Sequence, residues 1–129
     1  MGALVVAVVA AYAFARWRPF RVEIRGASMR PTLEPGDWAI AVAARRVRRG
    51  DVVVIEHPER PGFEMVKRVT GVAGDQVNEG HSVAEGELWV EGDDPGGSTD
   101  SRRFGPVTRD HVKARLLLVC WPLDRNRLL

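Results

Sequence analysis

Short apolar stretches separated by turn signals constrain the fold of this 129-residue chain more than any other feature of its sequence. The pattern begins after Pro19. Some stretches alternate apolar and polar residues, as half-buried strands do, and others are continuously apolar, as fully buried strands are. Clusters of glycine and proline lie between them and are typical of β-turns. The pattern predicts strands over residues 20–24, 38–42, 52–55, 63–70, 88–90 and 112–121, with a loop or short helical turn over 107–112.

So many short strands at close spacing predict a mainly β fold, a compact barrel or sandwich of short antiparallel strands. The length is sufficient for one domain with its own core. A single cysteine, Cys120, excludes an internal disulfide framework and a cysteine-based structural zinc site. We therefore expect one β-rich domain over residues 19–129, preceded by a separate N-terminal segment over residues 1–18.

The N-terminal segment has a different character. Residues 2–15 are apolar and uncharged, and Arg16, Trp17 and Arg18 follow them. The stretch is shorter than the roughly 20 residues that usually span a bilayer, and it lacks the basic start of a cleaved signal peptide. It also lacks the polar face of an amphipathic soluble helix. We expect a single-pass helical anchor over residues 1–18, with Trp17 and the arginines at the membrane interface.

The charge pattern gives no sign of a nucleic-acid partner, because 19 basic and 17 acidic residues are interspersed and the formal net charge is only +2. The one basic cluster, residues 45–49, is interpreted as a solvated turn between strands rather than as a contact with anionic lipid or nucleic acid. Asp93 and Asp94 have no histidine or further carboxylate placed to complete a metal site. We expect neither a metal nor a cofactor.

Ser28 and Lys67 are the residues that best account for a chemical function. A serine is a weak nucleophile until a base removes its proton, and an amine can be that base only when it is uncharged. Side chains alternate along a strand, so Lys67 shares its face with Phe63, Met65 and Val69. Desolvation among apolar neighbours lowers the pKa of a lysine, as a lysine general base requires. We expect Ser28 to lie at a strand end, with its hydroxyl facing Lys67.

Other interpretations of these residues remain open at the level of sequence. Ser28 can be a turn serine whose hydroxyl bonds its own backbone. Lys67 can be a lysine that extends to solvent from a half-buried strand. His57, His81 and His111 lie in loop-like surroundings, which leaves a Ser-His-Asp triad open without favouring it.

A glycine-rich polar stretch over residues 92–105 contains further candidates. Ser98 is placed to hydrogen-bond the amine of Lys67 and fix its direction. Asp100 and Arg102 are spaced to form an ion pair that braces the loop. The alternative interpretation is an ordinary polar surface loop.

Four segments of the sequence resemble, in order, the boxes of the type I signal peptidase family of Ser/Lys proteases. They are SMRPTL at 28–33, RRGDVVVI at 48–55, KRVTGVAGD at 67–75 and GDDPGGSTDSRRFGPV at 92–107. The resemblance extends from about Gly26 to Pro122. Its final part, from FGPV to Trp121-Pro122, is similar to the mitochondrial inner-membrane peptidases and their small bacterial relatives. A signal-peptidase-like β fold with one N-terminal hydrophobic helix is implied.

The resemblance also implies residue roles. Ser28 matches the nucleophile of the family, and Lys67 matches its general base. Ser98 matches the serine that hydrogen-bonds the lysine. Asp100 and Arg102 match the bracing pair, and Met29 matches the residue beside the nucleophile. The Ser28 backbone N–H matches one oxyanion donor.

Three positions depart from the family pattern. Gly26 stands where some members supply a second oxyanion donor from a hydroxyl, Ala73 replaces a usual proline, and Asp94 a common asparagine.

The implied activity is removal of N-terminal signal or leader peptides after small residues, with the substrate bound as an added β-strand. The partners are then a protein substrate and membrane lipid, with the catalytic domain on the extracytoplasmic side. Arginines that follow the apolar segment indicate the cytoplasmic side instead. Two alternatives are a maturation protease for the leader of a nickel-containing superoxide dismutase, and a non-catalytic membrane-tethered β-domain that binds a partner.

Overall fold

The computed structural model describes the backbone of residues 1–129 and every side chain except that of Trp17. Its main sheet has the strand order β1-β2-β9-β3-β4-β7-β8, with antiparallel neighbours throughout, and β10 pairs with β9 beside this path. A separate hairpin joins β5 to β6. The strands are β1 (Phe20–Glu23), β2 (Trp38–Val42), β3 (Val52–Glu56), β4 (Glu64–Gly71), β5 (Gln76–Val77), β6 (His81–Ser82), β7 (Glu87–Glu91), β8 (Val107–Thr108), β9 (Val112–Trp121) and β10 (Arg127–Leu128).

Helical structure is confined to α1 (Gly2–Trp17), the short helix α2 (Ser101–Phe104) and three single turns: η1 (Pro95–Gly97), η2 (Arg109–His111) and η3 (Leu123–Arg125). The predicted mainly β fold with one N-terminal apolar helix is therefore confirmed.

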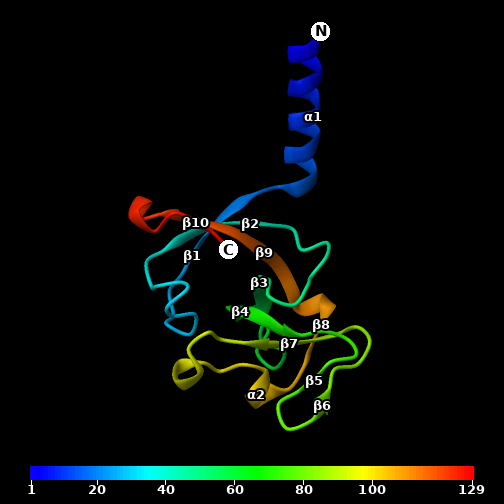
Figure 1. Cartoon of the computed structure of the whole chain (residues 1–129), viewed down its shortest axis with the longest axis vertical. Helices are drawn as coiled ribbons and strands as arrows, with labels where there is room; N and C mark the ends of the chain where they lie inside the picture. The colour runs from blue at the N-terminus through cyan, green and yellow to red at the C-terminus, as the bar shows by residue number, and fades with distance from the viewer.

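The sequence predicts a barrel or a sandwich of short antiparallel strands; the antiparallel strands are present, but the sheet stays open and does not close into a barrel. Along the path, β1 pairs with β2 alone and β8 with β7 alone among the described strands. The ten-residue strand β9 pairs with β2 through Arg115 to Trp121 and with β3 through Val112 to Arg115. Shifts in register interrupt both ladders, and irregularities of this kind bend a sheet. The sheet curves on itself (Figure 1), while its terminal strands, of four and two residues, remain unpaired with each other.

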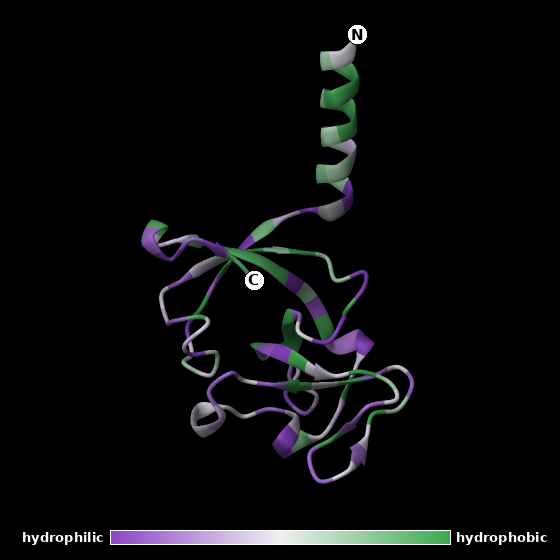
Figure 2. Cartoon of the chain, viewed as in Figure 1, coloured by the Kyte–Doolittle hydropathy of each residue, from purple (hydrophilic) through white to green (hydrophobic). Residues whose placement is uncertain are grey.

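The helix α1 projects away from the sheet (Figure 1), and it is mostly apolar up to its last turn, which contains Arg16 (Figure 2). It ends where Arg18 adopts a left-handed conformation and its N–H bonds the carbonyl of Phe14 at 2.8 Å, just before Pro19. Within the described chain, no helix is long and apolar enough to cross a membrane. The predicted single-pass span over residues 1–18 is thus not found, because a helix of 16 residues rises only about 24 Å. The expected interfacial position of Trp17 lies outside the described side chains.

Strand β3 separates two apolar clusters, which explains its continuously apolar sequence. Val52 and Val54 belong to one cluster, while Val53 and Ile55 belong to the other. The first cluster contains Met29, which is 1% exposed, and the second packs against the face of β4 that carries Lys67. The two clusters therefore anchor the segments that bear the candidate nucleophile and base.

Candidate active site

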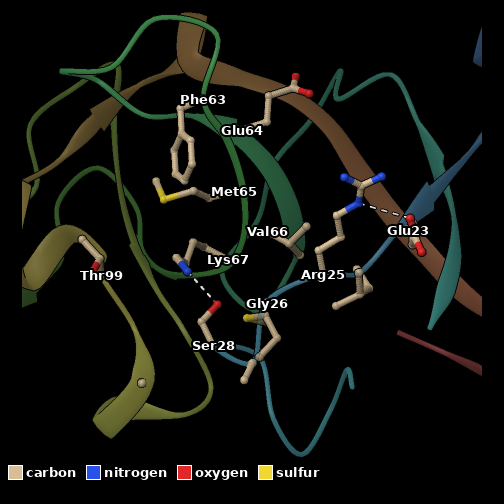
Figure 3. Close-up of a pocket in the computed structure, with 14 residues that line it drawn as sticks. Glu23, Arg25, Gly26, Ser28, Phe63, Glu64, Met65, Val66, Lys67 and Thr99 are labelled. Carbon is tan, nitrogen blue, oxygen red and sulfur yellow. Dashed lines mark hydrogen bonds and ion pairs between the residues drawn. The ribbon is translucent and has the colours of Figure 1, made fainter. Parts of the chain in front are cut away.

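The amine of Lys67 and the hydroxyl of Ser28 form a hydrogen bond of 2.7 Å across 39 positions of sequence (Figure 3). Lys67 lies in the middle of β4, opposite Val53 of β3. Ser28 lies in the loop that follows β1, and it is half-buried. The expected approach of these two side chains is present in the structure.

Lys67 is held in an apolar environment that disfavours its charged form. Its side chain lies on the same face of β4 as Met65 and Val69, which belong to or pack against the second cluster. Only 4% of Lys67 is exposed. This burial lowers the pKa of Lys67; the charge of Asp100 opposes the shift and that of Arg102 adds to it.

The loop that carries Ser28 is fixed on both sides. Met29, next to Ser28, is buried in the first cluster, and its carbonyl accepts a 2.9 Å hydrogen bond from the N–H of Leu33, another fully buried residue. The carbonyl of Ser28 accepts a 2.9 Å hydrogen bond from the N–H of Asp94. The nucleophile loop is thus attached to the apolar core and to the polar loop after β7.

Asp100 organises that polar loop. Its Oδ2 accepts hydrogen bonds from Ser98 Oγ at 2.6 Å, from Arg102 Nη2 at 2.6 Å and from the Gly92 N–H at 2.8 Å. Burial raises the pKa of Asp100, but the hydrogen bonds from Arg102, Ser98 and the backbone outweigh it and lower the pKa to about 2. The expected Asp100–Arg102 ion pair is therefore present, beside the Lys67 site.

The contacts of Ser98 differ from the expectation. Its hydroxyl donates to Asp100 and accepts from the Gly92 N–H at 3.1 Å, and in the described structure the hydrogen bond of the Lys67 amine goes to Ser28 instead. The carboxylate of Asp100, a charged acceptor two residues along the chain, competes for the hydroxyl proton more strongly than an amine does.

Gly92 is a site residue that sequence reasoning did not single out. A Cβ on Gly92 would lie 2.6 Å from the Ser28 carbonyl oxygen and would collide with Ser98 Oγ. Only glycine permits the nucleophile loop and the polar loop to approach each other here. Its position at the start of the polar stretch, directly after a buried strand, was the sequence signal that could have identified Gly92 as a site residue.

A pocket of about 440 Å³ opens beside the Ser28–Lys67 pair. One wall is the segment from Glu23 to Met29. The other is formed by Phe63 and by Glu64 to Lys67 of β4 (Figure 3). Gly97 and Thr99 of the polar loop complete it. Strand β7 pairs with β4 only from Arg68 onward, so in the described sheet the Glu64–Lys67 part of β4 has no strand neighbour on that side.

The other candidates from the sequence have different surroundings. His57 packs against Phe63 and Phe104, His81 against Trp89, and the ring of His111 bonds the hydroxyl of Thr108 at 2.9 Å. A Ser-His-Asp triad around Ser28 therefore has no support in these contacts.

The two acidic candidates have structural partners. Asp93 pairs with Arg68 at 2.8 Å, and Asp94 caps η1 by accepting from the Gly96 N–H. The described residues contain no group of three or more metal-ligating side chains.

The sequence matches the family described as signal peptidase, peptidase S26, over residues 1–79 and 76–121. The chain belongs to the signal peptidase S26 family. This confirms the resemblance of the four sequence boxes. The matched residues include Ser28 and Lys67 in the first part, and Ser98, Asp100 and Arg102 in the second.

Relatives in this signal peptidase family include mitochondrial inner membrane proteases. The chain is 36% identical to subunit 2 from Danio rerio over 119 aligned positions, which cover 79% of this chain and 64% of that protein. It is 35% identical to subunit 1 from Xenopus tropicalis over 112 positions, covering 77% and 67%. It is 38% identical to the ATP-independent subunit 1b from Arabidopsis thaliana over 115 positions, covering 77% and 68%. The chain thus matches about two thirds of the length of these relatives.

Proposed function

We propose that this chain is a serine endopeptidase that removes N-terminal signal or leader peptides, with Ser28 as nucleophile and Lys67 as general base. The observation that carries the proposal is the 2.7 Å contact between the Ser28 hydroxyl and the amine of Lys67, a residue that is only 4% exposed. Membership of the signal peptidase family supports the same chemistry.

The reaction is an acyl transfer in two stages. Neutral Lys67 removes the hydroxyl proton of Ser28, and Ser28 Oγ attacks the scissile carbonyl. The resulting oxyanion accepts a hydrogen bond from the Ser28 backbone N–H. Protonated Lys67 then gives its proton to the departing amine, which leaves an acyl-enzyme. A water molecule, deprotonated by Lys67, attacks the acyl carbon, and the bond from that carbon to Ser28 Oγ breaks. Lys67 returns the proton to Ser28 Oγ, which leaves the free serine, the neutral amine and the new carboxyl terminus.

The pocket suits an extended peptide. The Glu64–Lys67 part of β4 has no strand neighbour on the side away from β3, so it offers backbone donors and acceptors to a substrate strand there. The Glu23–Met29 wall lies opposite. We propose that the substrate adds as a strand between these walls, with a small side chain beside Ser28.

We also propose a two-part organisation: a membrane-associating segment over residues 1–18 and a peptidase domain over residues 19–129. Exposed apolar side chains on α1, such as Leu4, Val6 and Val9, support membrane association, as do relatives named as inner membrane proteases. We propose that the catalytic domain lies on the extracytoplasmic side, where signal peptides are removed; the alternative, which the arginines after the apolar segment favour, is the cytoplasmic side.

The test is cleavage of a synthetic leader peptide by the full chain, followed by mass spectrometry. Ser28→Ala and Lys67→Met should each lower kcat/KM by about 10⁴-fold or more. The matched controls are Ser82→Ala on the exposed strand β6 and Lys113→Met, which is 44% exposed. A peptide from the leader of a nickel-containing superoxide dismutase tests the second substrate class. Cleavage that survives Ser28→Ala, or a wild-type chain that binds the peptides without cutting them, would contradict the proposal.

A further inference from the structure

We propose that a pocket at the base of α1 binds the phosphodiester headgroup of an anionic phospholipid. This pocket, here called the arginine pocket, has a volume of about 460 Å³ and is lined by Tyr12, Ala15, Arg16, Arg18, Ala43 and Arg45. The proposal rests on the proposed membrane association and specifies the lipid chemistry that is recognised. It is independent of the peptidase chemistry at Ser28.

The charge of the arginine pocket is uncompensated, in contrast to that of the ion-paired arginines at three other places in the molecule. Arg49, Arg68 and Arg125 each form an ion pair with an aspartate. The lining of the arginine pocket includes three arginines and no acidic residue. Among the described residues, none of these three arginines forms an ion pair. Three guanidinium groups around one pocket repel one another, and an anion bound between them relieves that repulsion.

The arginine pocket is held together by hydrogen bonds that leave donors free. Arg109 Nη2 donates to the carbonyls of Ala44 at 3.3 Å and Arg45 at 2.9 Å, and so fixes the loop after β2. Arg45 Nη2 donates to the carbonyl of Arg16 at 3.3 Å, which joins that loop to the end of α1. A guanidinium has five N–H donors, so Arg45 retains others for a phosphate oxygen.

The C-terminal end of a helix normally repels anions through its exposed carbonyls. Here the last carbonyls of α1 already accept hydrogen bonds: Phe14 O from the Arg18 N–H, Ala15 O from Arg18 Nε, and Arg16 O from Arg45. The arginines that line the pocket thus also satisfy the carbonyls that would oppose an anion.

The position of the arginine pocket favours a lipid over a free anion or a nucleic acid. Its lining residues come from the end of α1 and the loop after β2, where the largely apolar helix (Figure 2) joins the rest of the chain. Tyr12, 66% exposed, lines the pocket together with the arginines, one helical turn before Arg16. A lipid whose acyl chains lie along α1 brings its phosphate to the level of Arg16 and Arg18. Aromatic and basic residues are characteristic of this interfacial level.

The experiment measures binding of the full chain to vesicles of phosphatidylcholine with and without phosphatidylglycerol. Wild type should prefer the anionic vesicles, and Arg16→Gln/Arg18→Gln/Arg45→Gln should reduce binding to them by about 100-fold, since each basic residue near the surface contributes about fivefold. The matched control is Arg25→Gln/Arg60→Gln/Arg103→Gln, which removes the same charge from exposed positions outside the arginine pocket and should keep the preference. High salt should abolish the preference in wild type, without any substitution.

The outcomes separate this proposal from those on which it rests. Equal binding of wild type to both vesicles overturns the headgroup site and leaves membrane association intact. Binding to neither vesicle overturns membrane association as well, while peptide cleavage still tests the peptidase. An equal loss in the control variant, or equal displacement by duplex DNA, overturns the site in favour of a general polyanion surface.

Discussion

Ser98 donates its hydroxyl proton to Asp100 Oδ2 at 2.6 Å, and the same carboxylate oxygen accepts from Arg102. Asp100 is buried and is kept ionised by these donors, which hold its pKa at about 2. A fixed negative charge therefore lies near the amine of Lys67 throughout the pH range in which a peptidase works. We infer that Ser98 influences the proposed base, Lys67, through this carboxylate.

The first prediction concerns that indirect route. Ser98→Ala should lower kcat by about tenfold, because Asp100 loses a charge-assisted hydrogen bond and holds its direction less firmly. In an Asp100→Asn background the same substitution should have little further effect, since the route through the carboxylate is already removed. A double-mutant cycle on peptide cleavage measures this. Additive effects would show that Ser98 acts on Lys67 directly.

The second prediction concerns pH. Because only neutral Lys67 accepts the serine proton, kcat/KM should fall about tenfold per pH unit below the pKa of Lys67. Burial lowers that pKa, so the acid limb should lie below the range of an ordinary lysine. A pH–rate profile of the wild-type chain tests both statements, and a flat profile into acid would rule out a lysine base.

Two variants test the directions in which the charges of Asp100 and Arg102 shift the pKa of Lys67. The charge of Asp100 raises the pKa of Lys67, so Asp100→Asn should move the acid limb to lower pH. The charge of Arg102 lowers it, so Arg102→Gln should move the limb to higher pH. Shifts in the same direction would contradict this assignment of charges.

The third prediction concerns the close approach at Gly92. Gly92→Ala should reduce kcat by about 100-fold, because the new methyl group pushes the Ser28 loop away from Lys67. Gly96→Ala is the matched control in the same loop, since its Cβ would meet only Asp94 Oδ1 at 3.7 Å. Peptide cleavage together with circular dichroism separates a displaced site from an unfolded chain. Full activity of Gly92→Ala would be incompatible with the loop packing.

Much of the sheet could be predicted because its longer strands carry strong patterns. Strands β2 and β9 have the predicted bounds, and the continuous apolar run of β3 reflects burial on both faces. The predicted helical turn over 107–112 corresponds to η2, preceded by the two-residue strand β8. Strands β5, β6 and β10 were not predicted, since two residues contain no measurable periodicity. The open sheet depends on which strands pair, which local patterns do not specify.

In the site, too, local sequence pattern predicted some features and could not predict others. Alternation along β4 correctly placed Met65 and Val69 beside Lys67, because a strand fixes which side chains share a face. The partner of Lys67 lies 39 positions away, so no local pattern specifies it. The chemistry of an activated serine suggested Ser28, and the family resemblance added to that expectation. Ser98 hydrogen-bonds Asp100 rather than Lys67 because of the geometry of its loop, which no spacing rule determines.

The last prediction concerns the ion pair between Asp37 and Arg125, which lies at the end of the loop that carries Ser28. Asp37, 2% exposed, accepts from Arg125 Nε at 3.0 Å and from the Glu34 N–H at 2.9 Å. Arg125→Met should lower the free energy of unfolding by about 3 kcal/mol, since it leaves a buried carboxylate unpaired. Adding Asp37→Asn should recover part of that loss.

Burial raises the pKa of Asp37, but Arg125 and the Glu34 N–H outweigh it and lower the pKa. The stabilisation is therefore present above the unfolded-state pKa and disappears as pH falls through the lower folded value. Urea unfolding across this range tests the sign, and equal pH dependence in wild type and the double variant would refute it.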